Sequence, residues 1–251
     1  MRVYVLPLGE VEVDVAKFMS WEPDRGERYV GPASGFLIQT DAGENVLVDT
    51  GMSPEHIENP EARVPQPDMI VTMRPEDDVR ARLREVGVDP SDVSLVIQTH
   101  LDFDHCGGNR FFAHAPFVIQ REHYEYAKAH PERFPPQDWD LPELEYRLID
   151  GDQEILPGIE LVTTPGHAPG HQSVIARGLA NTGTLILSAD AAHTHREFEE
   201  ELLPGTADDA DLLASIRKLK RIRDAENATL VTCHDADAWR DEYRISPEYY
   251  D

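Results

Sequence analysis

The chain has 251 residues, and its 48 acidic residues outnumber its 23 basic ones, which gives a formal net charge of −25. Such a charge is repelled by nucleic-acid backbones and anionic membrane surfaces, so we expect no nucleic acid and no membrane as partner. The first residues have no long apolar run, so we expect no signal peptide. No apolar stretch approaches the roughly 18 residues of a membrane span. Two cysteines make no disulfide framework. We expect a cytoplasmic protein with one domain over residues 1–251, large enough to bury a core.

Short apolar runs between turn residues predict strands along the whole chain. In chain order these runs lie at 2–6, 35–40, 45–49, 95–99, 116–120, 160–164, 172–176, 184–189 and 229–233. The turn at 41–44 joins the second and third runs into a hairpin. Helices are predicted at 77–86, 121–130 and 207–223, two of which place apolar side chains on one face.

Two proline-rich segments have no clear period. Residues 52–75 also carry many charges, and a connection of this length is more often functional than idle, so we interpret it as a lid. The same segment is a candidate surface for a homodimer. Residues 131–142 contain four prolines and form the second predicted long loop.

The stretch from Thr99 to Asn109 reads T-H-L-D-F-D-H-C-G-G-N and is dense in metal-ligand side chains. The candidates are His100, Asp102, Asp104 and His105. A strand would direct the first three to one side and His105 to the other. Convergence therefore predicts an irregular loop at a strand end, for which Gly107 and Gly108 supply backbone freedom.

Four predicted strands each end at a possible ligand. The runs ending at 99, 164, 189 and 233 lead to His100, His167, Asp190 and His234. Neighbouring strand ends in a sheet would bring these side chains together. A hydrogen-bonded loop residue is the ordinary alternative for any one of them, but the coincidence of four favours a shared site.

This pattern resembles the metallo-β-lactamase superfamily, whose motif is H-x-H-x-D-H after a strand, followed by a distant His, Asp and His. The resemblance covers residue 35 to the C-terminus and implies an α/β protein with an αββα four-layer sandwich and two divalent metal ions at one edge. Within the superfamily the chain is most similar to N-acyl-homoserine lactonases and 4-pyridoxolactonase. The shared features are H-L-x-F-D-H-x-G-G-N at 100–109, P-G-H-x-x-G-H at 165–171 and the tail from 234 to 249.

The resemblance also implies the ligand sets. One metal would be held by His100, Asp102 and His167, the other by Asp104, His105 and His234, with Asp190 bridging. Zinc is favoured, and Mn or Fe(II) are alternatives because Asp102 is a hard ligand. The implied activity is opening of a lactone ring, as in quorum quenching, by a hydroxide that the metal pair generates. Asp104 or a nearby group would pass a proton to the leaving alkoxide. His171 and Asp49 would orient ligands, with plain structural roles as the alternative.

Two positions depart from the lactonase pattern. Asp102 stands where a second His is usual; a carboxylate can ligate, but it predicts a weaker Lewis acid, and the alternative is that Asp102 does not ligate. His193 stands where the lactonases carry a Tyr that contacts the substrate carbonyl. Because a neutral imidazole can donate one hydrogen bond, we assign His193 a catalytic role, with a solvated loop residue as the alternative and His195 as a second candidate.

Other readings of the same fold are a glyoxalase II-like thioester hydrolase, another ester hydrolase, or a non-catalytic metal-binding protein. The acidic tail does not match the basic region that a glutathione thioesterase needs, and the full ligand set disfavours a non-catalytic protein. A small-molecule lactone or ester is the expected partner. Phe103, Phe134 and Trp139 are candidates for an acyl pocket, although aromatic residues more often belong to the core. Cys106 and Cys233 are interpreted as small buried apolar residues.

Overall fold

Two β-sheets form the centre of the computed structural model, which describes residues 1–22, 26–62, 64, 68–205 and 208–251. The first sheet has the order β4-β1-β2-β3-β5-β6-β7 and the second has the order β12-β11-β10-β9-β8. The strands are β1 (Arg2–Asp14), β2 (Arg28–Gln39), β3 (Asn45–Val48), β4 (Ile70–Thr72), β5 (Val93–Ile97), β6 (Phe117–Gln120), β7 (Tyr146–Ile149), β8 (Gln153–Leu156), β9 (Ile159–Thr163), β10 (Gln172–Leu179), β11 (Gly183–Leu187) and β12 (Thr229–Val231). The helices are α1 (Val15–Phe18), α2 (Val79–Glu85), α3 (Phe103–Cys106), α4 (Arg121–Ala129), α5 (His195–Glu200), α6 (Asp209–Glu226) and α7 (Ala236–Asp241).

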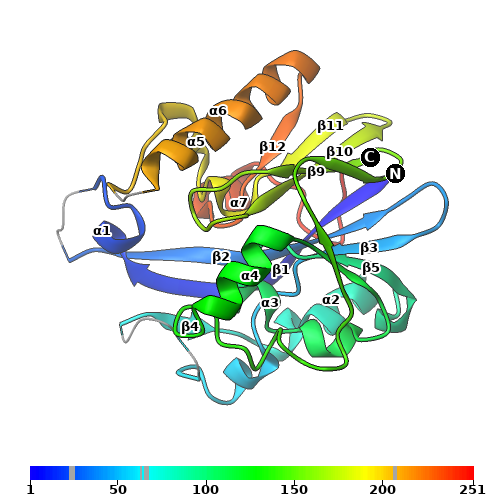
Figure 1. Cartoon of the computed structure of the whole chain (residues 1–251), viewed down its shortest axis with the longest axis horizontal. Coiled ribbons are helices and arrows are strands. Elements are labelled where there is room, and N and C mark those ends of the chain that lie inside the picture. The colour runs from blue at the N-terminus through cyan, green and yellow to red at the C-terminus, as the bar shows by residue number, and fades with distance from the viewer. Residues whose placement is uncertain (23–25, 63, 65–67, 206–207) are drawn as a thin grey trace.

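The two sheets pack face to face, because each central strand alternates buried side chains between its two faces. The core between them joins residues of the first sheet, such as Val5 and Ile38, to residues of the second, such as Val174 and Leu187. Helix α2 covers the outer face of the first sheet, and α6 covers the outer face of the second (Figure 1). The predicted αββα sandwich of class α/β is therefore confirmed.

Helix α6 shows why its sequence folds where it does. Leu212, Ile216 and Leu219 recur at helical spacing and are buried against the second sheet. Acidic residues occupy its first turn, which complements the helix dipole, and Asn227 ends it in the left-handed conformation. The predicted start at residue 207 lies outside the described residues.

Several strands are longer or more numerous than the sequence pattern predicts. Strands β1 and β2 continue past residue 6 and before residue 35, because they pair with each other along their whole length, as in Glu12 with Val30. Strands β7 and β8 were not predicted. The hairpin of β2 and β3 is confirmed, with Phe36 opposite Val48.

Part of the predicted lid at 52–75 forms regular secondary structure. It contains a 3₁₀ helix, η1 (Pro54–Ile57), and the edge strand β4, which pairs with β1 through Val71 and Val11. Residues 63 and 65–67 of the predicted lid lie outside the described residues. The predicted loop at 131–142 has no helix or strand.

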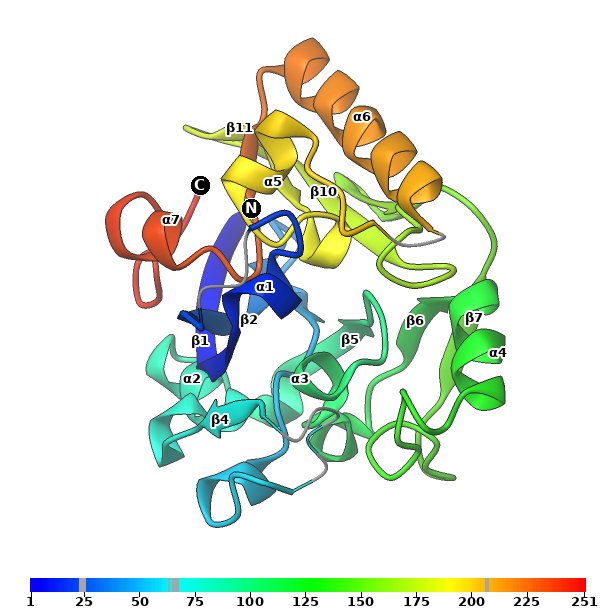
Figure 2. The same ribbon diagram turned by 90° about the vertical axis from the view of Figure 1, so that its left-hand side faces the viewer.

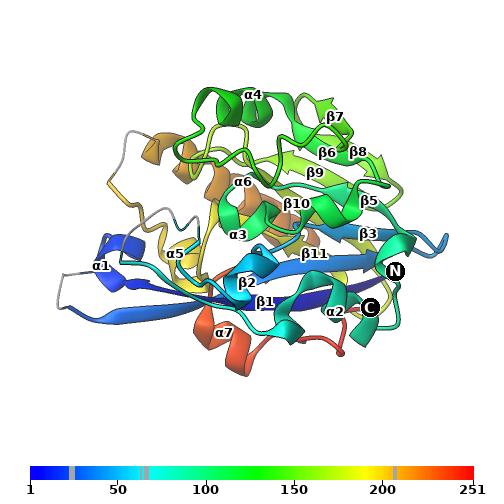
Figure 3. The ribbon, with the colours of Figure 1, turned by 90° about the horizontal axis from the view of Figure 1, so that it is seen from below.

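One end of the sandwich collects the loops that follow β5, β9, β11 and β12. Seen from that end, α1 lies between α5 and α3 (Figure 2). Helices α4 and α7 lie at opposite sides of the molecule, with the strands between them (Figure 3). No helix among the described residues is long and apolar enough to cross a membrane.

Candidate metal centre

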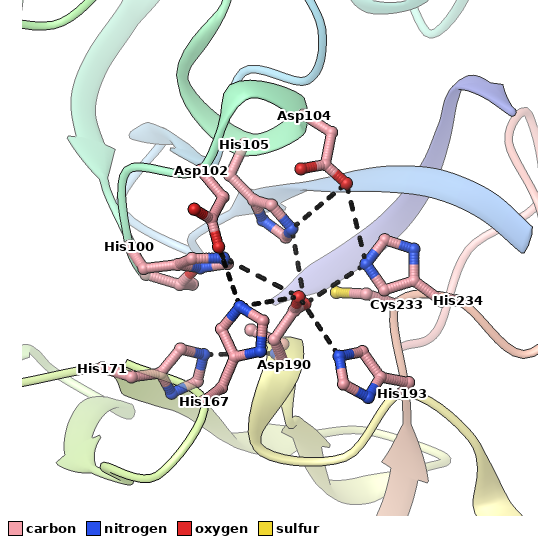
Figure 4. A network of polar contacts seen from close by, with 12 residues as sticks. His100, Asp102, Asp104, His105, His167, His171, Asp190, His193, Cys233 and His234 are labelled. Atoms are coloured by element: carbon pink, nitrogen blue, oxygen red, sulfur yellow. Dashed lines mark hydrogen bonds and ion pairs between the residues drawn. The ribbon is translucent and has the colours of Figure 1, made fainter. Parts of the chain in front are cut away.

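Two groups of three ligand side chains lie side by side at the end of the sandwich. The first group is His100, Asp102 and His167, and the second group is Asp104, His105 and His234. Within each group the ligand atoms lie within 4.8 Å of one another. All the predicted ligands therefore fall into one of the two groups, except Asp190, which lies between them (Figure 4).

Asp190 turns one carboxylate oxygen toward each group. Its Oδ2 is 3.7 Å from Nε2 of His100 and 3.5 Å from Nε2 of His167. Its Oδ1 is 3.3 Å from Nε2 of His105 and 3.4 Å from Nε2 of His234. The preceding residue, Ala189, has a φ of 47°, a conformation that is costly for a residue with a Cβ. The backbone at the end of β11 is thus held in an unusual shape that places this carboxylate between the groups.

The donor atoms of the two groups fit divalent cations. Nε2 of His100, Nε2 of His105 and Oδ1 of Asp190 are buried, and they find no hydrogen-bond partner among the described residues. An unpaired buried polar atom costs roughly 1–3 kcal/mol, so three of them in one place require another kind of partner. Imidazole and carboxylate donors together suit first-row divalent metals. The residues present therefore fit two divalent ions.

The electrostatics of the cluster also favour positive charge. Burial lowers the pKa of His105, but the carboxylates of Asp190 and Asp104 outweigh burial and raise that pKa well above its ordinary value. Burial raises the pKa of Asp190, but the surrounding imidazoles, with His105 first, bring it well below its ordinary value. Bound cations would take over the role of the protons on these imidazoles.

His100 and Asp102 lie in the loop between β5 and α3, as predicted, whereas Asp104 and His105 lie on the single turn of α3, which corrects the prediction of an irregular loop there. The backbone N–H of His105 donates to the carbonyl of Asp102 over 3.0 Å, at the start of α3. Gly107 and Gly108 have φ of −64° and −95°, so backbone freedom is not what they supply. Their role is space, because a Cβ on Gly107 would lie 2.1 Å from the backbone nitrogen of Ser53.

Buried acceptors hold the second group from behind. Asp49 Oδ2 accepts from His105 Nδ1 over 2.8 Å, and Asp49 Oδ1 accepts from the backbone N–H of Thr99 over 2.8 Å. His234 Nδ1 donates to the carbonyl of Pro32 over 2.8 Å. Each contact fixes the proton on Nδ1 and leaves Nε2 free for a metal. Asp49 therefore lies behind a candidate ligand, where the sequence analysis places it.

His171 supports the bridging residue. Its Nε2 accepts from the backbone N–H of Asp190 over 3.2 Å, and its Nδ1 lies 3.0 Å from the carbonyl oxygen of Thr164. Burial, together with the neighbouring His167, lowers the pKa of His171 well below its ordinary value, so the ring is neutral. The expected position of His171 behind a ligand is confirmed.

Arg133 is a site residue that the sequence analysis missed. Its Nη2 donates to Asp102 Oδ2 over 2.9 Å, and its Nε lies 3.3 Å from Asp102 Oδ1. It reaches the first group from the loop at 131–142, whose course cannot be predicted from a periodic pattern. The available signal was chemical, since an extra carboxylate in a ligand set calls for a basic partner.

His193 lines a cavity that opens above the two ligand groups, and it is paired with a buried carboxylate. Glu197 Oε2 accepts from the backbone N–H of His193 over 2.6 Å and lies 3.0 Å from its Nδ1. Burial lowers the pKa of His193, but Glu197 outweighs burial and raises it to about 9. Nε2 of His193 faces Asp190 Oδ2 at 3.7 Å. His195 instead lies 2.9 Å from the hydroxyl of Tyr243 and does not line the cavity.

A cavity of about 620 Å³ opens above the two groups. One wall is apolar and consists of Val11, Val13, Phe18, Trp21, Met69 and Phe103. The prediction that Phe103 lines a pocket is confirmed. Phe134 and Trp139 instead are buried in a core cluster with Leu101, which is the alternative that the sequence analysis gave for these aromatic residues. Cys106 and Cys233 are buried and free, as expected of small apolar residues.

The fold and the site define a class of proteins: αββα sandwiches with two metal-ligand groups at one end and one aspartate between the groups. The sequence profile of the metallo-β-lactamase superfamily matches residues 28–234, and the chain belongs to this superfamily. Its relatives include the N-acyl homoserine lactonase of Bacillus thuringiensis, which is 35% identical, the alignment covering 99% of this chain and 98% of the relative. The N-acyl homoserine lactonase AttM of Rhizobium radiobacter is 34% identical, with 100% and 98% covered.

Solved structures give the same result. One structure of N-acyl homoserine lactone hydrolase, with the product N-hexanoyl-L-homoserine bound at the catalytic metal centre, superposes with a TM-score of 0.89. It is 33% identical in sequence, and the alignment covers 99% of this chain and 98% of that one. The family resemblance expected from the motifs is therefore confirmed over nearly the full length.

Proposed function

We propose that this protein is a metal-dependent hydrolase that opens the ring of N-acyl homoserine lactones, a quorum-quenching activity. The observation that carries the proposal is Asp190, with one oxygen toward each ligand group at the base of a cavity that has an apolar wall. Such a site suits a substrate with a polar ring and an apolar chain. The relatives named above bear the same activity in their names.

The ligand sets that we propose are those of the two groups. His100, Asp102 and His167 hold one ion, Asp104, His105 and His234 hold the other, and Asp190 bridges them. Zinc is the proposed metal, because imidazole nitrogen and carboxylate oxygen are both among its usual ligands; Mn and Fe(II) are the alternatives. When bound, such ions lower the pKa of a water molecule and polarise an ester carbonyl.

Two residues of the chain handle protons and charge in this proposal. The Asp104 carboxylate lies at the cavity base, with Oδ2 3.8 Å from Nε2 of His105 and 3.8 Å from Nε2 of His234. From there it can accept a proton from the attacking water and return it to the leaving alkoxide. His193 presents Nε2 to the cavity while Glu197 fixes its other nitrogen, so it can donate to the carbonyl oxygen, as a Tyr hydroxyl would.

The apolar wall binds the acyl chain. Phe103 stands next to the ligands in the sequence, and Trp21 and Met69 reach the cavity from other segments. Burial of one CH₂ group contributes roughly 0.8 kcal/mol, so longer acyl chains bind more tightly until the wall is covered. We therefore expect KM to fall from a butanoyl to a hexanoyl to a decanoyl chain.

A panel on one zinc-loaded preparation tests the activity. The panel contains N-hexanoyl homoserine lactone, N-decanoyl homoserine lactone, a glutathione thioester and a simple aryl ester, each followed by acid release or product chromatography. We expect ring opening of the lactones to dominate and to be abolished in Asp190→Ala. The exposed Asp237→Ala is the matched control and keeps full activity. A preference for the thioester, or full activity of Asp190→Ala, would contradict the proposal.

Location and assembly complete the proposal. We place the protein in the cytoplasm, in keeping with its two free cysteines, and cell fractionation tests this. We propose a homodimer through the edge of the first sheet, where Ile70 of β4 and Val30 of β2 are 50% and 44% exposed and both pair with Glu12 of β1. Sedimentation of wild type and Ile70→Lys tests it, since a monomeric wild type would contradict the dimer. Residues 1–251 form one folding unit, for which a single calorimetric unfolding transition is expected.

A further inference from the structure

The guanidinium of Arg133 occupies the space around two donor atoms of the first group. Its Nη2 lies 2.9 Å from Asp102 Oδ2 and 3.3 Å from His167 Nε2. These two atoms are themselves only 2.9 Å apart. The same Nη2 donates to the carbonyl of His167 over 3.1 Å, which fixes the guanidinium in this position. One positive charge of the chain itself therefore lies directly against the first group.

The second group has no such neighbour in the part of the chain that the structure describes. Among the described residues, Asp104 and Asp190 form ion pairs with imidazoles alone. The groups behind His105 and His234 are a buried carboxylate and a backbone carbonyl. The two groups thus have the same number of donors but opposite surroundings, with a cation beside the first and acceptors behind the second.

The position of Arg133 matches the unusual charge of the first group. Asp102 adds one negative charge where a histidine would add none, and Arg133 adds one positive charge in contact with it. Burial lowers the pKa of Arg133, but Asp102 outweighs burial and raises it, so the guanidinium stays charged. Contacts through both Nε and Nη2 hold the carboxylate in one orientation, which a lysine could not do.

We propose that Asp102 and Arg133 act as one unit that replaces a neutral ligand, with Arg133 as a positioning residue that lowers the affinity of the first group for a divalent cation. This inference rests on the proposed two-ion site. The guanidinium repels an incoming cation and competes for the lone pair of His167. By drawing charge away from Asp102, it also leaves the ion held there a stronger Lewis acid than an unpaired carboxylate would.

The test measures cation affinity and not only turnover. Metal-free protein is titrated with Zn²⁺ in competition with a chromophoric chelator, for wild type, Arg133→Met and Arg133→Lys. We expect Arg133→Met to bind the weaker of the two ions at least ~10-fold more tightly, with the tighter ion unchanged, while kcat falls. Arg133→Lys keeps the charge without the two-point contact and is expected to lie between them.

Arg110→Met is the matched control. Arg110 also pairs with an aspartate, Asp138, over 3.2 Å, but neither residue belongs to a ligand group. Its Zn²⁺ titration is expected to match that of wild type. Circular dichroism of each variant reports whether it is folded, and Arg133→Lys keeps the test valid if Arg133→Met is not.

The double variant tests whether the charges of Arg133 and Asp102 compensate each other at the first group. Asp102→His alone leaves Arg133 facing a neutral ring, so zinc affinity of the first group is expected to fall at least ~10-fold. Asp102→His with Arg133→Met restores it to within about threefold of wild type. A double variant that binds zinc as weakly as Asp102→His alone, or an unchanged or weaker affinity in Arg133→Met, would overturn the inference. A rise in KM alone would overturn it too and would assign Arg133 to the substrate.

The two proposals can fail separately. If the titrations behave as expected but no lactone is opened, the coupling of Asp102 and Arg133 stands and the proposed substrate is wrong. If lactones are opened but Arg133→Met binds zinc no more tightly, the substrate stands and the role of Arg133 is wrong.

Discussion

The two ligand groups differ in what surrounds them more than in what they contain. In the second group His105 is 1% exposed and is backed by Asp49, which is itself held by Thr99 and Gln98. In the first group the His167 side chain is 20% exposed and is contacted by Arg133 from a loop. The sheet interior thus supplies rigid acceptors to one group, and the cavity rim supplies a cation to the other. From this difference we expect a tighter second site and a weaker, exchangeable first site.

The largest expected effects come from removing one histidine from each group. His105→Ala leaves the buried Asp49 carboxylate without its imidazole, and an uncompensated buried charge costs roughly 3–5 kcal/mol. We expect loss of ring-opening activity, loss of the second ion and a large drop in the free energy of unfolding. His167→Ala should lose the first ion and activity with little change in that free energy. Metal analysis and denaturant unfolding measure both; equal destabilisation would refute the distinction.

Asp49→Asn sharpens the same comparison without removing a ligand. Asp49 has a φ of 56°, a conformation that Asn tolerates, so the backbone is expected to be kept. Loss of the carboxylate behind a metal-ligating histidine lowers metal affinity about 10- to 100-fold. We expect this loss at the second group alone in a competitive zinc titration. Asp138→Asn is the control variant, because Asp138 is also a buried aspartate but pairs with Arg110 and belongs to neither ligand group, so both zinc affinities are expected to match those of wild type.

Stepwise metal removal probes the wild-type protein directly. With increasing chelator, we expect one equivalent of metal to leave first and the second to require at least ~10-fold more chelator, because only the first group faces Arg133. Mass spectrometry of the dialysed protein counts the ions at each step. Simultaneous loss of both ions would show that the surroundings do not separate the two sites.

The smallest expected effect comes from His123, which joins the two loops of the first group. Its Nε2 accepts from the backbone N–H of Leu101 over 2.9 Å, and its Nδ1 donates to the carbonyl of Pro169 over 2.8 Å. Burial lowers its pKa to about 4, from an ordinary value of 6.5. The native state therefore binds fewer protons than the unfolded chain between these values, and stability falls as the pH drops through that window.

The size of this effect can be stated for metal-free protein. Between pH 7 and pH 6 the His123 contribution to the free energy of unfolding should fall by about 0.7 kcal/mol, and the loss should continue toward pH 4. His123→Gln retains an acceptor and a donor but does not titrate, so its stability should depend less steeply on pH. Urea unfolding at each pH measures the slopes, and identical slopes would mean that His123 is not buried as a neutral ring.

The parts of this molecule that follow a period could be predicted from sequence. Apolar runs located β5, β9, β11 and β12, and their ends located the ligands, because a strand end fixes where the next residues lie. Strands β7 and β8 could not be predicted because their side chains are mostly exposed or half-buried and show no alternation. Arg133 could not be predicted because it reaches the site through tertiary contact with Asp102, which is distant in the sequence. Glu197 lies four residues after His193, a helical spacing that the sequence analysis did not use.

The glycine motif shows the same limit. The sequence shows Gly107 and Gly108 beside the ligands, but their physical role is the absence of a side chain and not a special φ. Sequence alone does not reveal which segment will pack against a given backbone. The neighbour here is the chain just after β3, some fifty positions earlier, and only the folded structure brings the two together.

Because of this close contact, the segment after β3 has two parts with different roles. Gly107 donates its backbone N–H to the carbonyl of Gly51 over 2.7 Å and is packed against Ser53, so the chain up to Ser53 is locked to the helix that carries Asp104 and His105. Met69, further along the same segment, forms part of the cavity wall. Changes in length or sequence after residue 58 can therefore reshape which acyl chains enter, while the reaction centre keeps its geometry, and this makes the segment the natural place to engineer selectivity.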